Sequence, residues 1–347
     1  MQEHKDVTIY DIAEKLDISP ATVSRGLKDH PAIKKETKKR IKEMAAKMGY
    51  QNNTFASNLR SRKTNTIGII IPRINSNFMS SVISGVEHVV NSKGYNLIIS
   101  QTQEDYDKEI ASATTMFNSR VDGLLVSLAS NTDRIVHFES LLRKKIPVIF
   151  FDRVLPHPDC TNVVIDNVQA GYDAVTHLID QGCRRIMYVG GSLKRNVYAD
   201  RLKGYKLALA DKDISFTDKY VHTDVLSEHT GVDAAKKLLE MKPRPDGVFA
   251  ANDSSAVACM QTLQDAGVRI PEDVAVVGFN NDPISWIARP KLTTVNYPGY
   301  EMGQIAATTL INAINKAPSS SLTTLVLKHE LIVRDSSIRD KVNSQRA

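Results

Sequence analysis

Hydrophobic positions follow two different periods along this chain. From Thr66 onward, short runs rich in Ile and Val recur, and segments with apolar residues at helical spacing separate them. Upstream of Thr66 the apolar positions follow helical spacing only. Runs of this length and composition are typical of buried strands. The runs read TIGIIIP, YNLIIS, VDGLLVS, IPVIFFD, NVVID, RIMYVGG, PDGVFAAND and VAVVGFNND.

The alternation of these runs with helical segments predicts parallel sheets that are covered by helices on both faces. The runs are too many for one small sheet, so we expect two Rossmann-like lobes. Ligands in such folds bind at the carboxyl ends of the strands. The polar residues that close each strand are therefore candidate ligand contacts.

The first fifty residues predict three short helices. Thr8 is placed to cap the first helix, and Ser19 to cap a second helix that begins at Pro20. A third helix follows Ile33 and ends at Gly49. Three short helices with a basic exterior are typical of a helix-turn-helix unit, whose second helix enters the major groove of DNA.

The distribution of charge supports this interpretation. Residues 1–63 hold 14 Lys and Arg against 8 Asp and Glu, and the remaining residues hold 31 of each. The whole net charge of +6 therefore lies in the first fifth of the chain. Such an excess is the footprint of a module that binds a polyanion. A basic face that only contacts solvent is the alternative.

Residues at the start of the second helix are expected to face base edges. Ala21 can contact a thymine methyl group, as can Pro20, and Arg25 can make a bidentate contact to guanine. The hydroxyl groups and the lysine beside them suit phosphates. A purely structural capping role is the alternative for Ser19 and Thr22, and Ser19 is expected to be a cap in any case.

The pattern TIYDIAEKLDISPATVSRGL, followed by ETKKRIKEMAAKMGYQNNTFASNLRSRKTNTIGIIIP, resembles the N-terminal region of the LacI/GalR family of bacterial transcriptional regulators. The resemblance implies that Pro20, Ala21 and Arg25 read bases. Asp17 stands where the family commonly has Gly, but Asp tolerates the left-handed conformation, so we expect the turn to be kept. The DNA-binding candidates in this unit are Thr8, Tyr10, Ser19, Pro20, Ala21, Thr22, Ser24, Arg25 and Lys28.

The linker at residues 51–65 carries Phe55, Ala56 and Leu59 at helical spacing. A helix this short is unstable alone in water, so it requires a second subunit or DNA. The resemblance implies that two linker helices lie in the minor groove, where Leu59 is inserted between base pairs. An inert tether is the alternative. The candidates here are Asn53, Ala56, Leu59 and Arg60.

The strand ends supply a mixed polar set for the second part of the chain. It consists of Ser127, Asp152, Arg153, Asn252 and Asn280. Amides, carboxylates and Arg in one cleft suit a polyhydroxylated ligand, whose hydroxyl groups both donate and accept. The resemblance implies that Arg201 crosses the cleft and that Asn75 and Phe78 line the opposite lobe, with Tyr297 nearby. Asp253 is equally suited to cap the following helix or to contact ligand.

Two departures from the family limit this assignment. Asn280 stands where many members have Asp, which removes a charge from the cleft. Leu226 and Gly299 stand where other members have aromatic residues that stack on sugars. The ligand is expected to be sugar-like, and its identity does not follow from the sequence.

The predicted fold is an N-terminal three-helix helix-turn-helix domain, a hinge helix, and two Rossmann-like lobes of periplasmic-binding-protein type. The predicted ranges are 1–50 for the DNA-binding domain, 51–65 for the hinge helix and linker, 66–164 plus 296–325 for the first lobe, 165–295 plus 326–337 for the second lobe, and 338–347 for a disordered tail. The tail lacks a leucine heptad, so we expect a homodimer, one subunit of which reads a half-site.

Several classes of protein are disfavoured. No apolar run reaches the roughly 18 residues that a membrane span requires. The N-terminus lacks the profile of a secretory signal, which indicates a cytoplasmic protein. The cysteines and histidines show no metal spacing, and no dinucleotide, P-loop or GxSxG motif occurs, so we expect no metal, no cofactor and no enzyme activity.

We therefore expect a sequence-specific DNA-binding transcriptional regulator. In this hypothesis a repressor dimer binds a pseudo-palindromic operator under the control of a small sugar or derivative in the cleft. One alternative is a catabolite-control-type regulator whose main effector is a protein or phosphoprotein, and a less favoured one is a solute-binding protein. The sequence leaves open whether ligand releases or promotes DNA binding.

Overall fold

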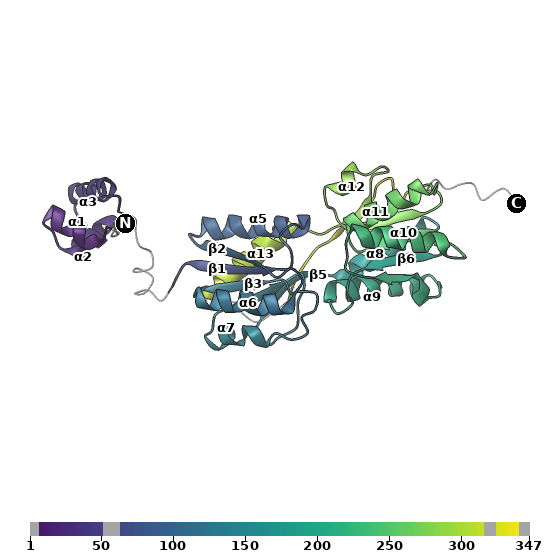
Figure 1. Cartoon of the computed structure of the whole chain (residues 1–347), viewed down its shortest axis with the longest axis horizontal. Coiled ribbons are helices and arrows are strands. Elements are labelled where there is room, and N and C mark those ends of the chain that lie inside the picture. The colour runs from purple at the N-terminus through teal and green to yellow at the C-terminus, as the bar shows by residue number, and fades with distance from the viewer. Residues whose placement is uncertain (1–6, 51–62, 316–323, 340–347) are drawn as a thin grey trace, which may run out of the picture. The chain divides into compact units, whose positions relative to one another are not determined.

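The computed structural model describes residues 7–50, 63–315 and 324–339 (Figure 1). The chain divides into two compact units, Met1–Thr64 and Asn65–Ala347. The change of pattern at Thr66 thus lies next to the boundary between the units. Most of the predicted hinge helix, residues 51–62, and most of the predicted tail, residues 340–347, lie outside the described residues.

The first unit contains the three predicted helices. They are α1 (Ile9–Leu16), α2 (Pro20–Leu27) and α3 (Lys35–Lys47). Ile12, Val23 and Ile41 are fully buried and bring one residue from each helix into a common core. Gly26 allows α2 to approach α3, because a Cβ at this position would lie 2.4 Å from Cδ1 of Ile41.

The predicted caps and turn of this unit are confirmed. The Asp11 carboxylate accepts hydrogen bonds from the backbone N–H and the hydroxyl of Thr8, both at 2.7 Å. Asp17 ends α1 with a φ of 53°, the left-handed conformation that the turn requires. Gly49 follows α3 with a φ of 69°.

The first lobe of the second unit is a six-stranded parallel sheet in the order β11-β5-β4-β3-β1-β2. Two core layers flank the sheet, one under α5 and α13 and the other under α6 and α7 (Figure 1). The strands are β1 (Thr66–Ile71), β2 (Asn96–Gln101), β3 (Gly123–Val126), β4 (Val148–Phe151), β5 (Thr161–Ile165) and β11 (Thr324–Leu327). The helices are α5 (Asn77–Ser92), α6 (Tyr106–Asn118), η1 (Val136–Phe138), α7 (Glu139–Arg143) and α13 (Gly299–Ile314).

The second lobe is a six-stranded sheet in the order β12-β10-β9-β8-β6-β7, in which only β12 runs antiparallel to its neighbour. The strands are β6 (Ile186–Gly190), β7 (Val221–Thr223), β8 (Gly247–Ala250), β9 (Ala275–Asn280), β10 (Thr293–Asn296) and β12 (Glu330–Ile332). The helices are α8 (Asn167–Asp180), α9 (Asn196–Asp211), η2 (Asp218–Tyr220), α10 (Glu228–Glu240), α11 (Asp253–Asp265) and α12 (Ile284–Ile287).

The chain passes between the lobes after β5, after β10 and after β11. The predicted boundary between 325 and 326 falls inside β11. This strand pairs with β5 over all four residues, so it belongs to the first lobe as far as Leu327. Asn296 lies in the range predicted for the first lobe, but it closes β10 of the second sheet. The predicted boundary thus divides the apolar run Leu325–Leu327, while β10 continues one residue past Val295 because Asn296 still pairs with Asn280.

Candidate functional site

One side of α2 carries the predicted base-reading residues. Ala21, Arg25 and Lys28 are exposed and lie at spacings of three and four residues, so they share one side of the helix. Val23 and Gly26 are buried on the opposite side. The helix is therefore fixed to the core along one side and leaves the other exposed, an arrangement that is compatible with a recognition helix.

The remaining candidates of this unit are partly occupied by local contacts. The Ser19 hydroxyl accepts a hydrogen bond from the Thr22 N–H at 3.1 Å, which confirms Ser19 as the cap of α2. Pro20 occupies the first position of this helix, as predicted. Tyr10 is 66% exposed, whereas the Thr8 hydroxyl already donates to Asp11. The linker candidates Asn53, Ala56, Leu59 and Arg60 lie outside the described residues.

In the second unit, a cleft of about 570 Å³ lies between the ends of strands from both lobes. It brings together all but one of the predicted ligand residues. They are Asn75, Phe78, Asp152, Arg153, Arg201, Asn252, Asn280 and Tyr297. The exception is Ser127, which does not line the cleft. Ser127 is fully buried and its hydroxyl donates to Oδ2 of Asp152 at 3.2 Å.

Asp152 is the buried carboxylate of the cleft. It accepts from Ser127 and, at Oδ1, from the Tyr297 hydroxyl at 2.9 Å. Its pKa is raised because burial disfavours the charged form more than the charges of Arg153 and Arg201 and the hydrogen bonds favour it. Its backbone φ of 58° is strained for a residue that has a Cβ. Backbone strain of this kind is common at functional sites.

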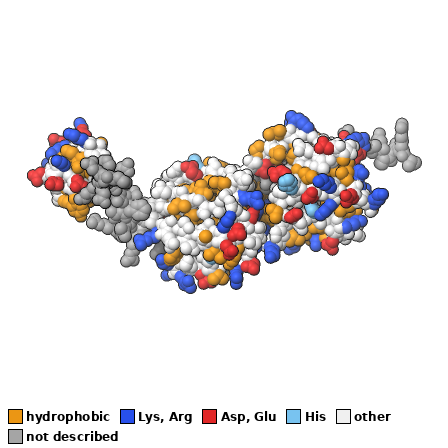
Figure 2. Space-filling view, in the orientation of Figure 1, with side chains coloured by type: hydrophobic (Ala, Val, Ile, Leu, Met, Phe, Trp, Pro, Cys, Tyr) orange, Lys and Arg blue, Asp and Glu red, His pale blue; other side chains and the backbone are white. Residues whose placement is uncertain are grey.

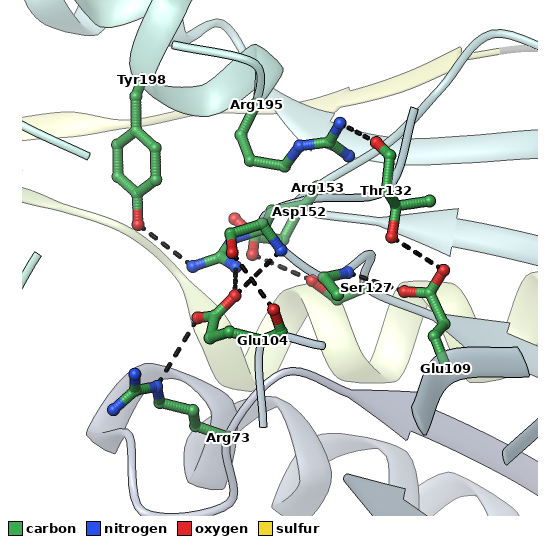
Figure 3. Close-up of polar contacts among 11 residues, drawn as sticks. Arg73, Glu104, Glu109, Ser127, Thr132, Asp152, Arg153, Arg195 and Tyr198 are labelled. Carbon is green, nitrogen blue, oxygen red and sulfur yellow. Dashed lines mark hydrogen bonds and ion pairs between the residues drawn. The ribbon is translucent and has the colours of Figure 1, made fainter. Parts of the chain in front are cut away.

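Arg153 is already engaged by the protein. Its Nη1 donates to Oε2 of Glu104 at 2.6 Å, and its Nη2 donates to the hydroxyl of Tyr198 at 3.1 Å (Figure 3). Glu104 also lies 3.7 Å from Nε of Arg73. Burial opposes the charge of Arg153, but Tyr198, Glu104 and Asp152 together raise its pKa above the ordinary value. Arg153 therefore shapes the cleft through its partners.

These partners of Arg153 were not predicted, although the sequence carries signals for them. Arg73 and Glu104 follow β1 and β2, so the rule of polar residues after strands could have found them. Tyr198 precedes Arg201 by three residues on α9, and this spacing places both on one side of the helix.

Arg201 is fixed in the second-lobe wall of the cleft. Its Nε donates to Oδ1 of Asn167 at 2.9 Å and its Nη1 to the carbonyl of Ala251 at 2.8 Å. The guanidinium lies 3.5 Å from the centre of the Phe279 ring, a cation–π contact. Burial lowers the pKa of Arg201. The planar group is thus oriented before any ligand arrives.

The two asparagines predicted to contact ligand, Asn252 and Asn280, have different roles. Asn252 caps α11, because its Oδ1 accepts from the Ser255 N–H at 2.9 Å, and Asn252 is also among the residues that line the cleft. Asn280 has a φ of 114°, a conformation rare for a residue with a Cβ, and its amide donates to Asp282 at 3.3 Å. Asp253 neither caps α11 nor lines the cleft.

Aromatic rings form the remaining wall. Phe78 and Tyr297 stack with their ring centres 4.2 Å apart. Leu226 lines the cleft, while Gly299 lies beneath the aromatic pair, where an added Cβ would come within 3.0 Å of the Phe78 carbonyl. A side chain at position 299 would therefore be crowded against Phe78, and Phe78 and Tyr297 supply the aromatic rings of this wall.

Other classes of site are not found in the described residues. Within residues 7–50, 63–315 and 324–339, no cluster of His, Cys, Asp or Glu is arranged to hold a metal ion. No helix in this described part is long and apolar enough to span a membrane. On the face of the second unit seen in Figure 2, side chains of both charges are interspersed.

Known proteins match the chain in both units. Residues 8–53 match the family described as bacterial regulatory proteins, lacI family, and residues 175–337 match the periplasmic binding protein-like domain. Catabolite control protein A of Priestia megaterium is 34% identical over 332 residues, which cover 95% of this chain and 99% of that protein. The chain belongs to the lacI family of bacterial regulatory proteins. This lacI-family protein is a DNA-binding transcriptional regulator, and its first unit is the DNA-binding module.

Solved structures agree with this assignment. The transcriptional regulator CelR–cellobiose complex is 27% identical, with a TM-score of 0.72 over 95% of this chain and 99% of that chain. The lac repressor dimer bound to operator and the anti-inducer ONPF is 20% identical, with a TM-score of 0.87 over 96% of this chain and 100% of that one. The second likeness shows that the lacI-family fold is shared.

Proposed function

We propose that this regulator is a cytoplasmic repressor that binds a pseudo-palindromic operator as a homodimer. We further propose that a neutral, polyhydroxylated molecule of the sugar class controls it from the cleft. The composition of the cleft supports this proposal most directly, because it combines fixed hydrogen-bonding groups with a stacked aromatic pair.

The charges in the cleft support a neutral ligand. Three arginines line it together with five carboxylic acids, which are Glu104, Asp152, Asp224, Glu228 and Asp282. Arg153 is paired with Glu104. A phosphorylated ligand would therefore meet no excess of positive charge, whereas hydroxyl groups can donate to carboxylates and accept from Arg201 and the amides.

Besides hydrogen-bonding groups, a sugar site requires an apolar surface, and the aromatic rings supply it. Phe78 and Tyr297 offer an apolar surface for the C–H face of a sugar ring, and Tyr198 lies beside Arg201. The related CelR structure holds cellobiose, a sugar, which agrees with this class of ligand.

Thermal unfolding in the presence of neutral sugars and of sugar phosphates tests the ligand class. A neutral sugar at 100 times its dissociation constant should stabilise the protein by about 2.7 kcal/mol. Stabilisation by sugar phosphates alone would contradict the charge argument. If no small molecule stabilised the protein, the alternative of a protein or phosphoprotein effector would be favoured instead.

A further inference from the structure

The start of α9 reaches from the second lobe onto the first. The side-chain amide of Asn196 donates through Nδ2 to the carbonyl of Asp152 at 3.1 Å. Its Oδ1 accepts from the backbone N–H of Val154 at 3.0 Å. One neutral side chain thus satisfies a backbone acceptor and a backbone donor of the other lobe, on either side of Arg153.

The neighbouring Arg195 also crosses between the lobes, but with poorer hydrogen bonding. It is 2% exposed, and its Nη2 donates to the carbonyl of Thr132 in the first lobe (Figure 3). Its Nε and Nη1 are enclosed by protein and have no hydrogen-bond partner among the described residues. The guanidinium of Arg195 is therefore buried between the lobes while two of its donor nitrogens form no hydrogen bond.

The electrostatic surroundings of Arg195 also disfavour its charged form at this position. Burial is the main cause that lowers its pKa, and the charge of Arg153 lowers it further. Glu109, Asp133 and Glu104 act in the opposite direction without reversing the shift. The charged side chain is consequently less stable here than in water, where all its donors would be solvated.

Asn196 and Arg195 contribute with opposite signs to the free energy of the contact between the lobes. A hydrogen bond that replaces one to water contributes little net stability, whereas a buried donor left unmade costs its full desolvation. When the lobes come together, Asn196 forms two hydrogen bonds. Arg195 forms one hydrogen bond, and two of its donor nitrogens lose their contact with water. Separation of the lobes at this point would break the bonds of Asn196 and would hydrate Arg195.

We propose that Arg195 and Asn196 are positioning residues that together form a contact between the lobes, called the catch below. Asn196 favours the lobe arrangement of this structure, and Arg195 opposes it. Near balance suits a ligand-controlled protein, because a ligand shifts an equilibrium only by its differential affinity for the two states. Asn196 and Arg195 would thereby set how strongly ligand binding changes the lobe arrangement. This last consequence rests on the proposed function, whereas the catch itself does not.

The distance between spin labels on the two lobes tests the catch without ligand or DNA. Val136 and Leu193 are exposed on either side of it, and Cys160, Cys183 and Cys259 are buried, so cysteines introduced at 136 and 193 are labelled selectively. The labelled full-length protein is diluted with unlabelled protein, which leaves only distances within one subunit.

Asn196→Ala should shift the distance distribution toward longer values, and Arg195→Met should shift it toward shorter values. Each change should alter the ratio of the two populations on the order of tenfold, as expected for one or two hydrogen bonds. Lys194→Met removes an exposed neighbouring cation and is the matched control, for which we expect no shift. If Asn196→Ala fails to fold, Asn196→Asp removes the donor and keeps the acceptor.

A shift to longer distances in Arg195→Met would make Arg195 a stabilising latch and would overturn the proposal. An unchanged distribution in folded Asn196→Ala or Asn196→Asp would overturn it equally. Because no sugar is present in these measurements, their failure can be told apart from a failure of the proposed ligand class.

Discussion

At the scale of single residues, Arg201 shows how this regulator prepares a site in advance. Asn167 and the Ala251 carbonyl hold its guanidinium in one plane, and the Phe279 ring covers one face. Little side-chain entropy remains to be lost when a ligand binds, so most of the interaction energy is available for affinity.

Arg201→Ala should abolish the thermal stabilisation that a bound sugar gives and should leave operator binding intact. Arg201→Lys keeps a charge but loses the planar fork, so it should lose most of the stabilisation as well. Loss of operator binding in a variant that still unfolds cooperatively would show that Arg201 acts on the DNA-binding unit and not on the ligand.

Asp253 should make the stability of this protein depend on pH. Burial raises its pKa from 3.8 to about 8, although hydrogen bonds from Thr294 and Asp282 act against the shift. The folded chain then keeps a proton that the unfolded chain releases between these two values. The free energy of unfolding should therefore fall as pH rises through this window, by about 1.4 kcal/mol per pH unit at most.

Asp253→Asn removes this titration while it keeps an acceptor for the Asp282 N–H. Chemical denaturation between pH 5 and pH 8, compared in wild type and variant, measures the difference. Equal slopes in both proteins would show that Asp253 is already ionised throughout this range.

At the scale of elements, α2 combines a buried side with an exposed side that carries Arg25. Arg25→Ala should weaken binding to a specific site by roughly 1–3 kcal/mol, because a bidentate base contact is lost. Binding to random DNA should change far less. Arg40→Ala removes an exposed cation from α3 and is the matched control for charge; equal effects of the two variants on specific binding would contradict base reading by Arg25.

The linker at residues 51–62 remains a prediction. Leu59→Ala should weaken specific binding more than non-specific binding, because it removes the apolar wedge and leaves the phosphate contacts. Affinities for an operator and for random DNA, measured at one salt concentration, give the comparison. A similar loss on both DNAs would argue against the wedge.

The elements were largely predictable, whereas the pairing of side chains inside the cleft was not. Ser19, Pro20 and Asp17 mark the ends of helices through local chemistry that the sequence displays. Several strand ends could be predicted because apolar runs stop there, whereas β9 and β10 continue to the polar residues Asn280 and Asn296. The burial of Ser127 beneath Asp152 and the Arg153–Glu104 pair depend on how strands and loops are placed beside one another, which no local pattern contains.

At the scale of the whole molecule, charge separates two tasks. The net charge of +6 lies in the first 63 residues, and the rest of the chain has as many acidic as basic residues. Attraction to the DNA backbone thus belongs to the small unit, while the large one can hold a neutral ligand without itself attracting DNA. Coupling between them requires a lobe equilibrium that a ligand can shift.

Selection of bound sites from random DNA by the full-length protein tests the central claim most directly. We predict enrichment of a pseudo-palindrome with two matching half-sites, and loss of preference at one position of each half-site in Arg25→Ala. Recovery of no preferred sequence at low salt, or of a single unpaired half-site, would contradict a dimeric, sequence-reading repressor.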